Sequence, residues 1–380
     1  MHLQADRMRL SDIEAQILDL ERSLSALLAE KRLVQERIDS YRYPVLTLPN
    51  EIVSEILVHV LPPYPDPLPL FGTLSPTTLT HICRKWREVA LATPMLWRAM
   101  RFFEFHPLDH QRRISDIWMR RSGSCPLSIQ IVGHRSPCVS ELLPAMVPHR
   151  ARWGHLRLQT PQPSPSAIDG PMPQLLHLHL EATEAWHDVL AFREVPLLRS
   201  VVINTLALSA VILPWVQLTS LTLYSFKSSE CIPILQQTPN LIHCSLHLWS
   251  DLDIIDHSGP DISLPCLESL AFRGSLGVVT KFLVTFIVPA LRSLETPETF
   301  LWFDPIESLK SFISKSGCEL QDVCISGNRT TREAAYFVAF PSIPNFSFTG
   351  PYIREWNDDE ESEDESNSDS SDGESDSDSV

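Results

Sequence analysis

The sequence predicts a mixed α/β protein in which helical segments precede a repeat solenoid with a curved parallel sheet. Three observations carry this prediction. Leucines and isoleucines recur at heptad spacing near the N-terminus, a dense apolar cluster follows between residues 46 and 98, and a short proline-led motif recurs every 20 to 29 residues after about residue 150. At 380 residues the chain is long enough for two domains, or for one domain with appendages.

Residues 8–43 are predicted to form a coiled-coil helix. Ser11 and Glu14 have the spacing of a capping box, and no proline or glycine interrupts the heptad series. Only Lys31 interrupts the apolar seam. A helix whose apolar residues recur in steps of three and four typically pairs with another helix along that seam. We favour a homodimer; a helix that folds back on its own chain or stands alone is the alternative. The seam consists of Leu10, Ile13, Ile17, Leu20, Leu24, Leu27, Val34, Ile38 and Tyr41.

Residues 44–102 are predicted to be a small all-α domain. Pro49 suits the first position of a helix whose apolar side holds Ile52, Val53, Ile56, Leu57, Val60 and Leu61. A second helical series follows, with Leu79, Ile82, Cys83, Trp86, Val89 and Ala90, and then a tight turn with Pro94, Leu96 and Trp97. A unit of about fifty residues has little interior. Part of this apolar surface is therefore expected to bind a partner, although a generic helical bundle remains the alternative.

The motifs LPxEI at 48–52, IL at 56–57, CRKWR at 83–87 and LWR at 96–98 resemble the F-box, a docking motif for the small adaptor of cullin–RING ubiquitin ligases. A proline-rich insertion, residues 62–78, is longer than the usual F-box inter-helix loop. It is expected either to be a surface loop or to obstruct the adaptor. The resemblance implies that a Skp-type adaptor, which recruits cullin, contacts Leu48, Pro49, Ile52, Ile56, Leu57, Trp86, Leu96 and Trp97.

Residues 103–149 are predicted to supply connecting helices and a first capping strand, and residues 150–353 an irregular leucine-rich-repeat-like solenoid. Each repeat contributes one strand to a parallel sheet. Paired inward positions such as Leu178 and Leu180 support the strands; an ordinary α/β domain with evenly spaced strands is the alternative. The first apolar positions of the repeats are Trp153, Leu175, Leu198, Leu218, Leu241, Leu267, Leu291 and Leu320.

The outward positions of these strands are predicted to form a concave binding face. Because tyrosine, tryptophan and arginine are the usual energetic anchors of interfaces, we expect cargo to contact Tyr224, Trp249 and Arg273, with His247 beside them. The whole face consists of His179, Glu181, Val202, Asn204, Thr222, Tyr224, Ser245, His247, Trp249, Ala271, Arg273 and Glu295.

No catalytic motif, phosphate-binding glycine loop or metal-ligand spacing stands out, so we expect no enzyme activity, no cofactor and no metal. His177 and His179 lie at i, i+2 without matching ligands. The densest polar cluster is interpreted as a solvated loop and consists of Asp251, Asp253, Asp256 and His257.

The tail, residues 354–380, is predicted to be disordered because it is acidic and serine-rich. It supplies −12 of the formal net charge of −16, so the remaining chain is nearly balanced and broad nucleic-acid affinity is not expected. Four serines precede an acidic residue by three positions, which resembles casein kinase 2 acceptor sites; a solubilising tail is the alternative. They are Ser362, Ser366, Ser371 and Ser375.

The eight cysteines include no C-x-x-C pair, and neither a signal core nor a membrane-spanning run is evident, so the cytoplasm or nucleus is the expected location. The order of segments resembles F-box-like proteins abundant in mushroom-forming fungi. That resemblance implies a substrate-recognition subunit of an SCF-type ubiquitin ligase, whose repeats bind the target protein. The alternative is a non-ligase scaffold of coil and repeats whose F-box does not engage the adaptor.

Overall fold

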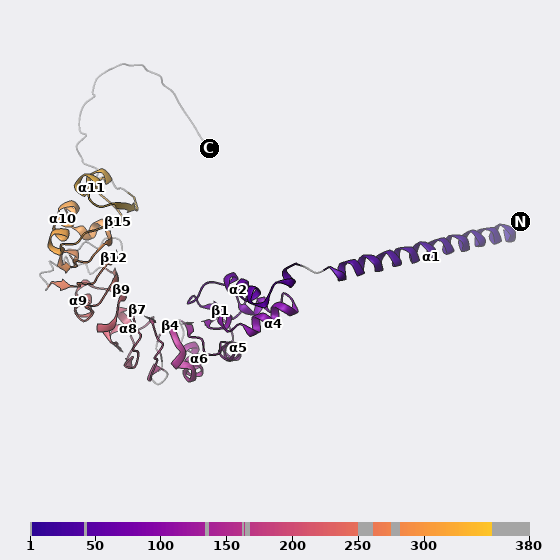
Figure 1. Cartoon of the computed structure of the whole chain (residues 1–380), viewed down its shortest axis with the longest axis horizontal. Helices are drawn as coiled ribbons and strands as arrows, with labels where there is room; N and C mark the ends of the chain where they lie inside the picture. Colours follow the sequence, from indigo (N-terminus) through magenta and orange to yellow (C-terminus); the bar gives the residue numbers. More distant parts are fainter. Residues whose placement is uncertain are drawn as a thin grey trace, which may run out of the picture. The chain divides into compact units, whose positions relative to one another are not determined.

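The computed structural model describes residues 2–41, 44–133, 137–161, 163, 168–249, 261–274 and 282–351 (Figure 1). The chain divides into two compact units, Met1–Met100 with Arg113–Cys125, and Arg101–Arg112 with Pro126–Val380. The polar cluster around Asp251 and the four candidate phosphoacceptor serines lie outside the described residues.

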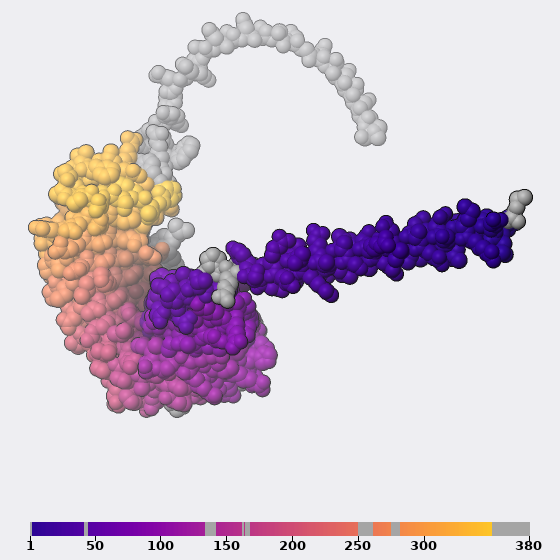
Figure 2. Space-filling view, turned by 45° about the vertical axis from the view of Figure 1, so that its right-hand side comes forward, coloured from indigo at the N-terminus to yellow at the C-terminus, as the bar shows by residue number. Residues whose placement is uncertain are grey.

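Helix α1 (His2–Ser40) is a single uninterrupted helix of 39 residues. It begins well before Ser11, so the predicted capping box at Ser11 and Glu14 is wrong: both residues lie inside the helix. No described residue of α1 is buried, and Figure 2 shows its surface in indigo. The apolar seam of the helix is therefore exposed in the described chain.

The small domain of the first unit has its helices in the predicted order, but the prediction that it is all-α is wrong, because the insertion contains the short strand β1. It contains η1 (Pro44–Thr47), α2 (Asn50–Val60), β1 (Leu68–Pro69), α3 (Pro76–Leu79), α4 (Arg84–Ala92) and η2 (Pro94–Trp97). The second helical series is not continuous, because Cys83 is extended and its Sγ accepts a hydrogen bond from the Trp86 amide at 3.4 Å. A side chain that accepts from the third amide beyond it acts as an N-cap, so α4 starts afresh at Arg84.

Trp97 lies at the centre of this domain and is fully buried. Its indole N–H donates to the carbonyl oxygen of Ala90 at 2.9 Å, and its ring meets that of Trp118 edge to face with 5.5 Å between centroids. The Arg121 guanidinium lies 4.6 Å from the Trp97 ring. Trp118 and Arg121 belong to α5 (Leu108–Arg121), so the core includes a helix from beyond residues 44–102.

The proline-rich insertion is a folded part of the domain. Leu68 and Leu70 are buried at 4% and 2% exposure, and the Ser75 hydroxyl donates to the carbonyl oxygen of Leu70 at 3.0 Å. The guanidinium of Arg98 stacks 3.9 Å from the centroid of the Tyr64 ring. The buried leucines and the contact between Arg98 and Tyr64 show that the insertion packs into the domain, so it is more than the surface loop that the sequence left open.

In the second unit, neighbouring strands of the main sheet follow one another in the chain, as the colours from magenta to yellow show in Figure 1. Every described pair from β3 to β16 is parallel. β2 (Ala99–Phe103) carries the chain from one unit to the other. The strands are β3 (Leu127–Val132), β4 (Trp153–Thr160), β5 (His177–Ala182), β7 (Ser200–Asn204), β9 (Ser220–Phe226), β10 (His243–Leu248), β12 (Ser269–Gly274), β14 (Ser293–Pro297), β15 (Asp322–Ser326) and β16 (Asn345–Thr349).

Short helices and two small parallel pairs, β6 with β8 and β11 with β13, make up the return segments between these strands. The small strands are β6 (Leu190–Ala191), β8 (Val211–Ile212), β11 (Ile262–Ser263) and β13 (Phe286–Ile287). The helices are α6 (Pro137–Met146), η3 (Val147–Arg152), α8 (Thr205–Leu208), η4 (Trp215–Gln217), α9 (Ser228–Gln236), η5 (Phe282–Thr285), η6 (Glu298–Leu301), α10 (Pro305–Ser316) and α11 (Glu333–Ala339).

The register of the sheet aligns the repeats that the sequence predicts. Leu178 pairs with Val201, Val201 with Leu221, and the same row continues through Cys244 and Leu270 to the C-terminal strands. All are buried, as are the predicted inward residues two positions on. The prediction of a mixed α/β fold with a long parallel sheet is confirmed. The last strand, β16, was missed because no leucine motif precedes it.

Candidate protein-interaction surfaces

Helix α2 carries an exposed apolar stripe, which consists of Ile52, Ile56 and Val60. Ile52 is 48% and Val60 57% exposed, and Ile56 is half-buried. Residues four apart lie one above another on a helix, so the three side chains form one continuous strip. A surface helix usually places polar side chains on its solvent face. The stripe therefore exposes aliphatic side chains at positions where a surface helix usually has polar or charged ones.

A second apolar row of α2, adjacent to the stripe, faces the core. Val53, Leu57 and Leu61 follow the stripe residues by one position each, and their exposures are 0%, 0% and 7%. The helix thus divides its aliphatic residues between a buried row that anchors it and an exposed row.

The eight residues predicted to contact an adaptor do not all lie on the surface. Pro49 and Ile52 are exposed, and Leu48, Ile56 and Trp86 are half-buried. Leu57, Leu96 and Trp97 have exposures of 0 to 2%, so their assignment to direct contact is wrong: they form the core that holds α2. The sequence interpretation did not select Val60 or Ile82, which are 57% and 56% exposed. The spacing of Val60 from Ile56 could have identified it.

The insertion packs away from the stripe. Pro62, Tyr64 and Leu68 line a cavity of about 40 Å³ together with Val58 of α2. Val58 follows Ile56 by two positions, which places it about 200° around the helix axis. Because the stripe stays exposed with the insertion in place, the described part of the insertion leaves this surface open.

The second surface is the open face of the main sheet, formed by the outward residues of its strands. The predicted face residues from His179 to Glu295 are all exposed or half-buried on this side. Small side chains form its middle. Register rows there contain Ser200, Ser220, Ser269, Ser293, Val202, Thr222, Ser245 and Ala271, and the larger His243 lies between Ser220 and Ser269.

Three of the four predicted cargo residues lie in one register row. Tyr224 pairs with His247 and His247 with Arg273, and the Tyr224 and His247 rings lie 4.1 Å apart. The Arg273 guanidinium is held 3.2 Å from a carboxylate oxygen of Glu295. Trp249, 53% exposed, follows directly after β10. Burial, and then the charge of Arg273, lower the pKa of His247, against the opposing effect of Glu295. This row therefore presents the rings of Tyr224 and His247 and the guanidinium of Arg273 beside the mostly small side chains at the middle of the face.

A histidine group that the sequence did not predict as a site lies at the other end of the same face. His155 and His177 stack with 4.4 Å between ring centroids. His179 follows on the same strand, 3.6 Å from a carboxylate oxygen of Glu181, which also lies 3.8 Å from Arg157. Burial lowers the pKa of His177. Burial and the charge of Arg157 lower the pKa of His179 to about 4. His179 is therefore neutral at pH 7, and the shift at His177 also favours its neutral ring.

The pKa of His179 predicts a loss of stability in acid. The folded state binds its proton less readily than the unfolded chain, where the pKa is about 6.5, so its contribution is complete above that pH and falls toward pH 4. The loss is expected to reach about 2 kcal/mol. Urea unfolding of wild type and His179→Gln at pH 7 and pH 4.5 should show a smaller decrease in the variant. An equal decrease in both proteins would assign the acid sensitivity to other groups.

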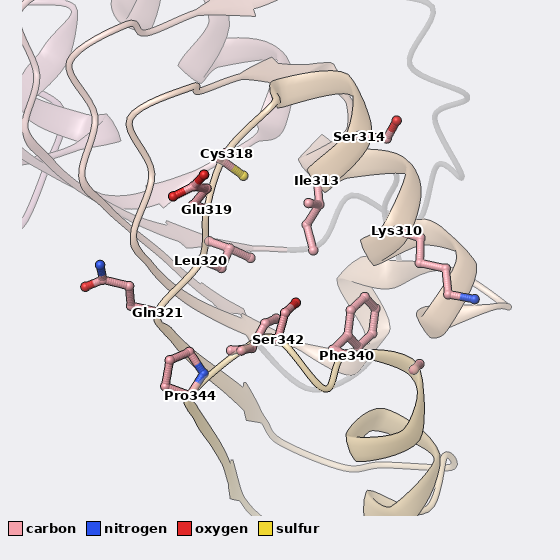
Figure 3. Close-up of a pocket in the computed structure, with 12 residues that line it drawn as sticks. Lys310, Ile313, Ser314, Cys318, Glu319, Leu320, Gln321, Phe340, Ser342 and Pro344 are labelled. Carbon is pink, nitrogen blue, oxygen red and sulfur yellow. The ribbon is translucent and has the colours of Figure 1, made fainter.

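A cavity of about 710 Å³ lies between α10 and the turns that precede β15 and β16 (Figure 3). Its lining combines apolar residues such as Leu320 and Phe340 with polar ones such as Glu319 and Gln321. Cys318 also lines it, but burial raises the pKa of this thiol, which disfavours the nucleophilic thiolate. The described lining offers no pair of nucleophile and base.

No protein-family model matches the chain, and no curated protein matches it either. Within the described ranges, no group of three or more His, Cys, Asp or Glu residues is arranged to hold a metal ion. None of the described helices has the length and apolar character needed to cross a membrane.

Proposed function

We propose that this chain is a substrate-recognition subunit of an SCF-type cullin–RING ubiquitin ligase. The small helical domain would act as the F-box that docks a Skp-type adaptor, and the parallel sheet would act as a leucine-rich-repeat-like platform that binds the target protein. The observation that carries the proposal is the exposed apolar stripe of α2, which lies inside the segment whose motifs resemble an F-box.

The stripe has the geometry of a helix that binds in a groove. An apolar helix face seated in a partner's groove presents anchors on one side of the helix, and the i, i+4 spacing of Ile52, Ile56 and Val60 provides such a side. Each aliphatic side chain contributes about 1.5 to 3 kcal/mol when it moves from water into a packed interface. The row of Val53, Leu57 and Leu61 fixes the helix to its own core, so the stripe is presented by a rigid element.

The open face of the sheet suits target binding because every strand adds outward side chains at fixed spacing. Tyr224, Trp249 and Arg273 are exposed and of the types that dominate interface energies. A receptor of this kind needs no reactive group of its own. It accelerates transfer by holding the target close to the ubiquitin-charged enzyme.

The second candidate is a scaffold of coil and repeats that does not bind the adaptor. The folded insertion favours it, because Leu68 and Leu70 make the insertion part of the domain core and so change the shape of the F-box-like unit.

Capture of purified Skp-type adaptor and cullin by the purified chain tests the proposal. We expect wild type to capture both, and Ile52→Asp/Val60→Asp to weaken adaptor binding by on the order of 100-fold, because two charges would enter an apolar contact. Leu74→Asp is the matched control: Leu74 is 54% exposed but lies in the insertion. Absence of capture by wild type, or equal capture by the stripe variant, would favour the scaffold.

A further inference from the structure

The seam of α1 is a long apolar surface that no described segment buries. Its ten positions run from Leu10 to Tyr41, and the nine apolar ones are 39 to 68% exposed. Their steps alternate between three and four residues over the whole length. An ideal helix would turn about 20° per heptad away from such a row, and two helices that supercoil keep it in contact. A helix that lies on a globular body follows the 3.6-residue period instead. The spacing therefore favours a second helix as the occupant.

We propose that α1 binds α1 of a second copy of this chain in a parallel, in-register, two-stranded coiled coil. Leu10 and Ile17 then occupy a positions, and Ile13 and Leu20 occupy d positions, in the usual heptad lettering a to g. The same assignment places Arg9 at g, Glu14 at e, and Lys31 at a.

The flanking charges favour the parallel orientation. In a parallel pair, g of one helix faces the following e of the other, so Arg9 meets Glu14 of the second copy twice. The later g positions add no further pair of opposite charges: Glu30 faces Gln35, and Arg37 would face position 42, which lies beyond the end of α1 at Ser40. In the antiparallel alignment that overlaps the seam fully, Gln16 faces Arg37 and Ser23 faces Glu30, so no opposite charges meet.

Lys31 favours two strands over three. A single lysine at an a position specifies register and oligomeric state at some cost in stability. In a parallel pair its hydrophobic stem runs along the seam, and its ammonium reaches solvent beside Glu30 of the second copy. A trimer would instead enclose three ammonium groups at its axis, which buries charge without a partner.

Such a dimer presents two copies of the open sheet face. Two linked binding faces raise the apparent affinity for a target that has two sites. This consequence does not require adaptor binding, so the dimer stands whether or not the F-box-like domain docks.

Sedimentation equilibrium of the full chain tests the pairing. Wild type is expected at twice the 43.0 kDa monomer mass. Leu20→Asp/Leu24→Asp, which changes the seam, is expected at the monomer mass, with at least a 100-fold rise in the dissociation constant. Leu18→Asp/Leu33→Asp is the matched control, because these leucines are 48% and 60% exposed but lie at b and c, and it should remain dimeric. A monomeric or trimeric wild type, or a dimeric seam variant, would overturn the proposal.

Disulfide trapping tests the orientation. A Leu10→Cys variant should form a covalent dimer on mild oxidation, because the two a positions face each other in a parallel pair. Wild type oxidised under the same conditions is the control for crosslinks through the native thiols. If the Leu10→Cys variant is dimeric by mass but forms no more covalent dimer than wild type, the parallel arrangement is contradicted.

Discussion

Replacement of Leu57 by Asp is expected to unfold the small helical domain, whereas Ile52→Asp leaves it folded. The two side chains lie on the same helix, but Leu57 is 0% and Ile52 48% exposed. Leu57→Asp removes an aliphatic side chain from the core and places a carboxylate there without a partner. The expected loss in the free energy of unfolding is about 4 kcal/mol or more, a large fraction of the 5 to 15 kcal/mol typical of a domain.

Urea unfolding of the full chain, followed by tryptophan fluorescence, measures this difference. We expect a transition at much lower urea for Leu57→Asp and a change within about 0.5 kcal/mol for Ile52→Asp, which is a surface position. Equal midpoints for the two variants would show that Leu57 faces solvent. If the prediction holds, loss of adaptor binding by a Leu57 variant reports unfolding, and the interface itself has to be tested at Ile52 and Val60.

The contrast within α2 shows where sequence reasoning stopped. Its apolar residues form two adjacent rows, one of which begins with Ile52 and the other with Val53. Periodicity identifies the helix, but both rows fit it equally well. The choice between them depends on contacts from distant segments, such as the insertion and α4, which no local pattern contains.

Local chemistry and tertiary contacts account for the other differences. The Sγ of Cys83 caps α4, so the helical series from Leu79 to Ala90, which the apolar spacing predicted as one run, is divided at Cys83. Trp97 resembled a docking residue, but Trp118 covers it from a helix outside the motif. The parallel sheet was predictable because its buried rows repeat at nearly constant spacing. Pairs such as His155 with His177 depend on register between strands, which a single strand's sequence does not specify.

Replacement of Phe272 by Ala is expected to have the largest effect on the sheet. Phe272 is fully buried, and its ring lies 5.7 Å from that of Phe286, 5.8 Å from Phe300 and 6.2 Å from Phe282, each at a steep angle. The substitution removes the one ring that contacts all three others and leaves a cavity. A loss of about 3 to 5 kcal/mol is expected, since edge-to-face contacts add to the burial term.

Phe303→Ala is the matched control, because Phe303 is 84% exposed and its loss should cost less than about 0.5 kcal/mol. In a sheet whose strands are stacked in chain order, each strand contacts only its neighbours. Loss of stability at one strand is therefore expected to decrease with distance along the sheet. Hydrogen exchange of Phe272→Ala should therefore show faster amide exchange in β10, β12 and β14, with protection retained in β4 and β5. A uniform loss of protection over the whole sheet would contradict this local response and show that the sheet unfolds as one cooperative unit.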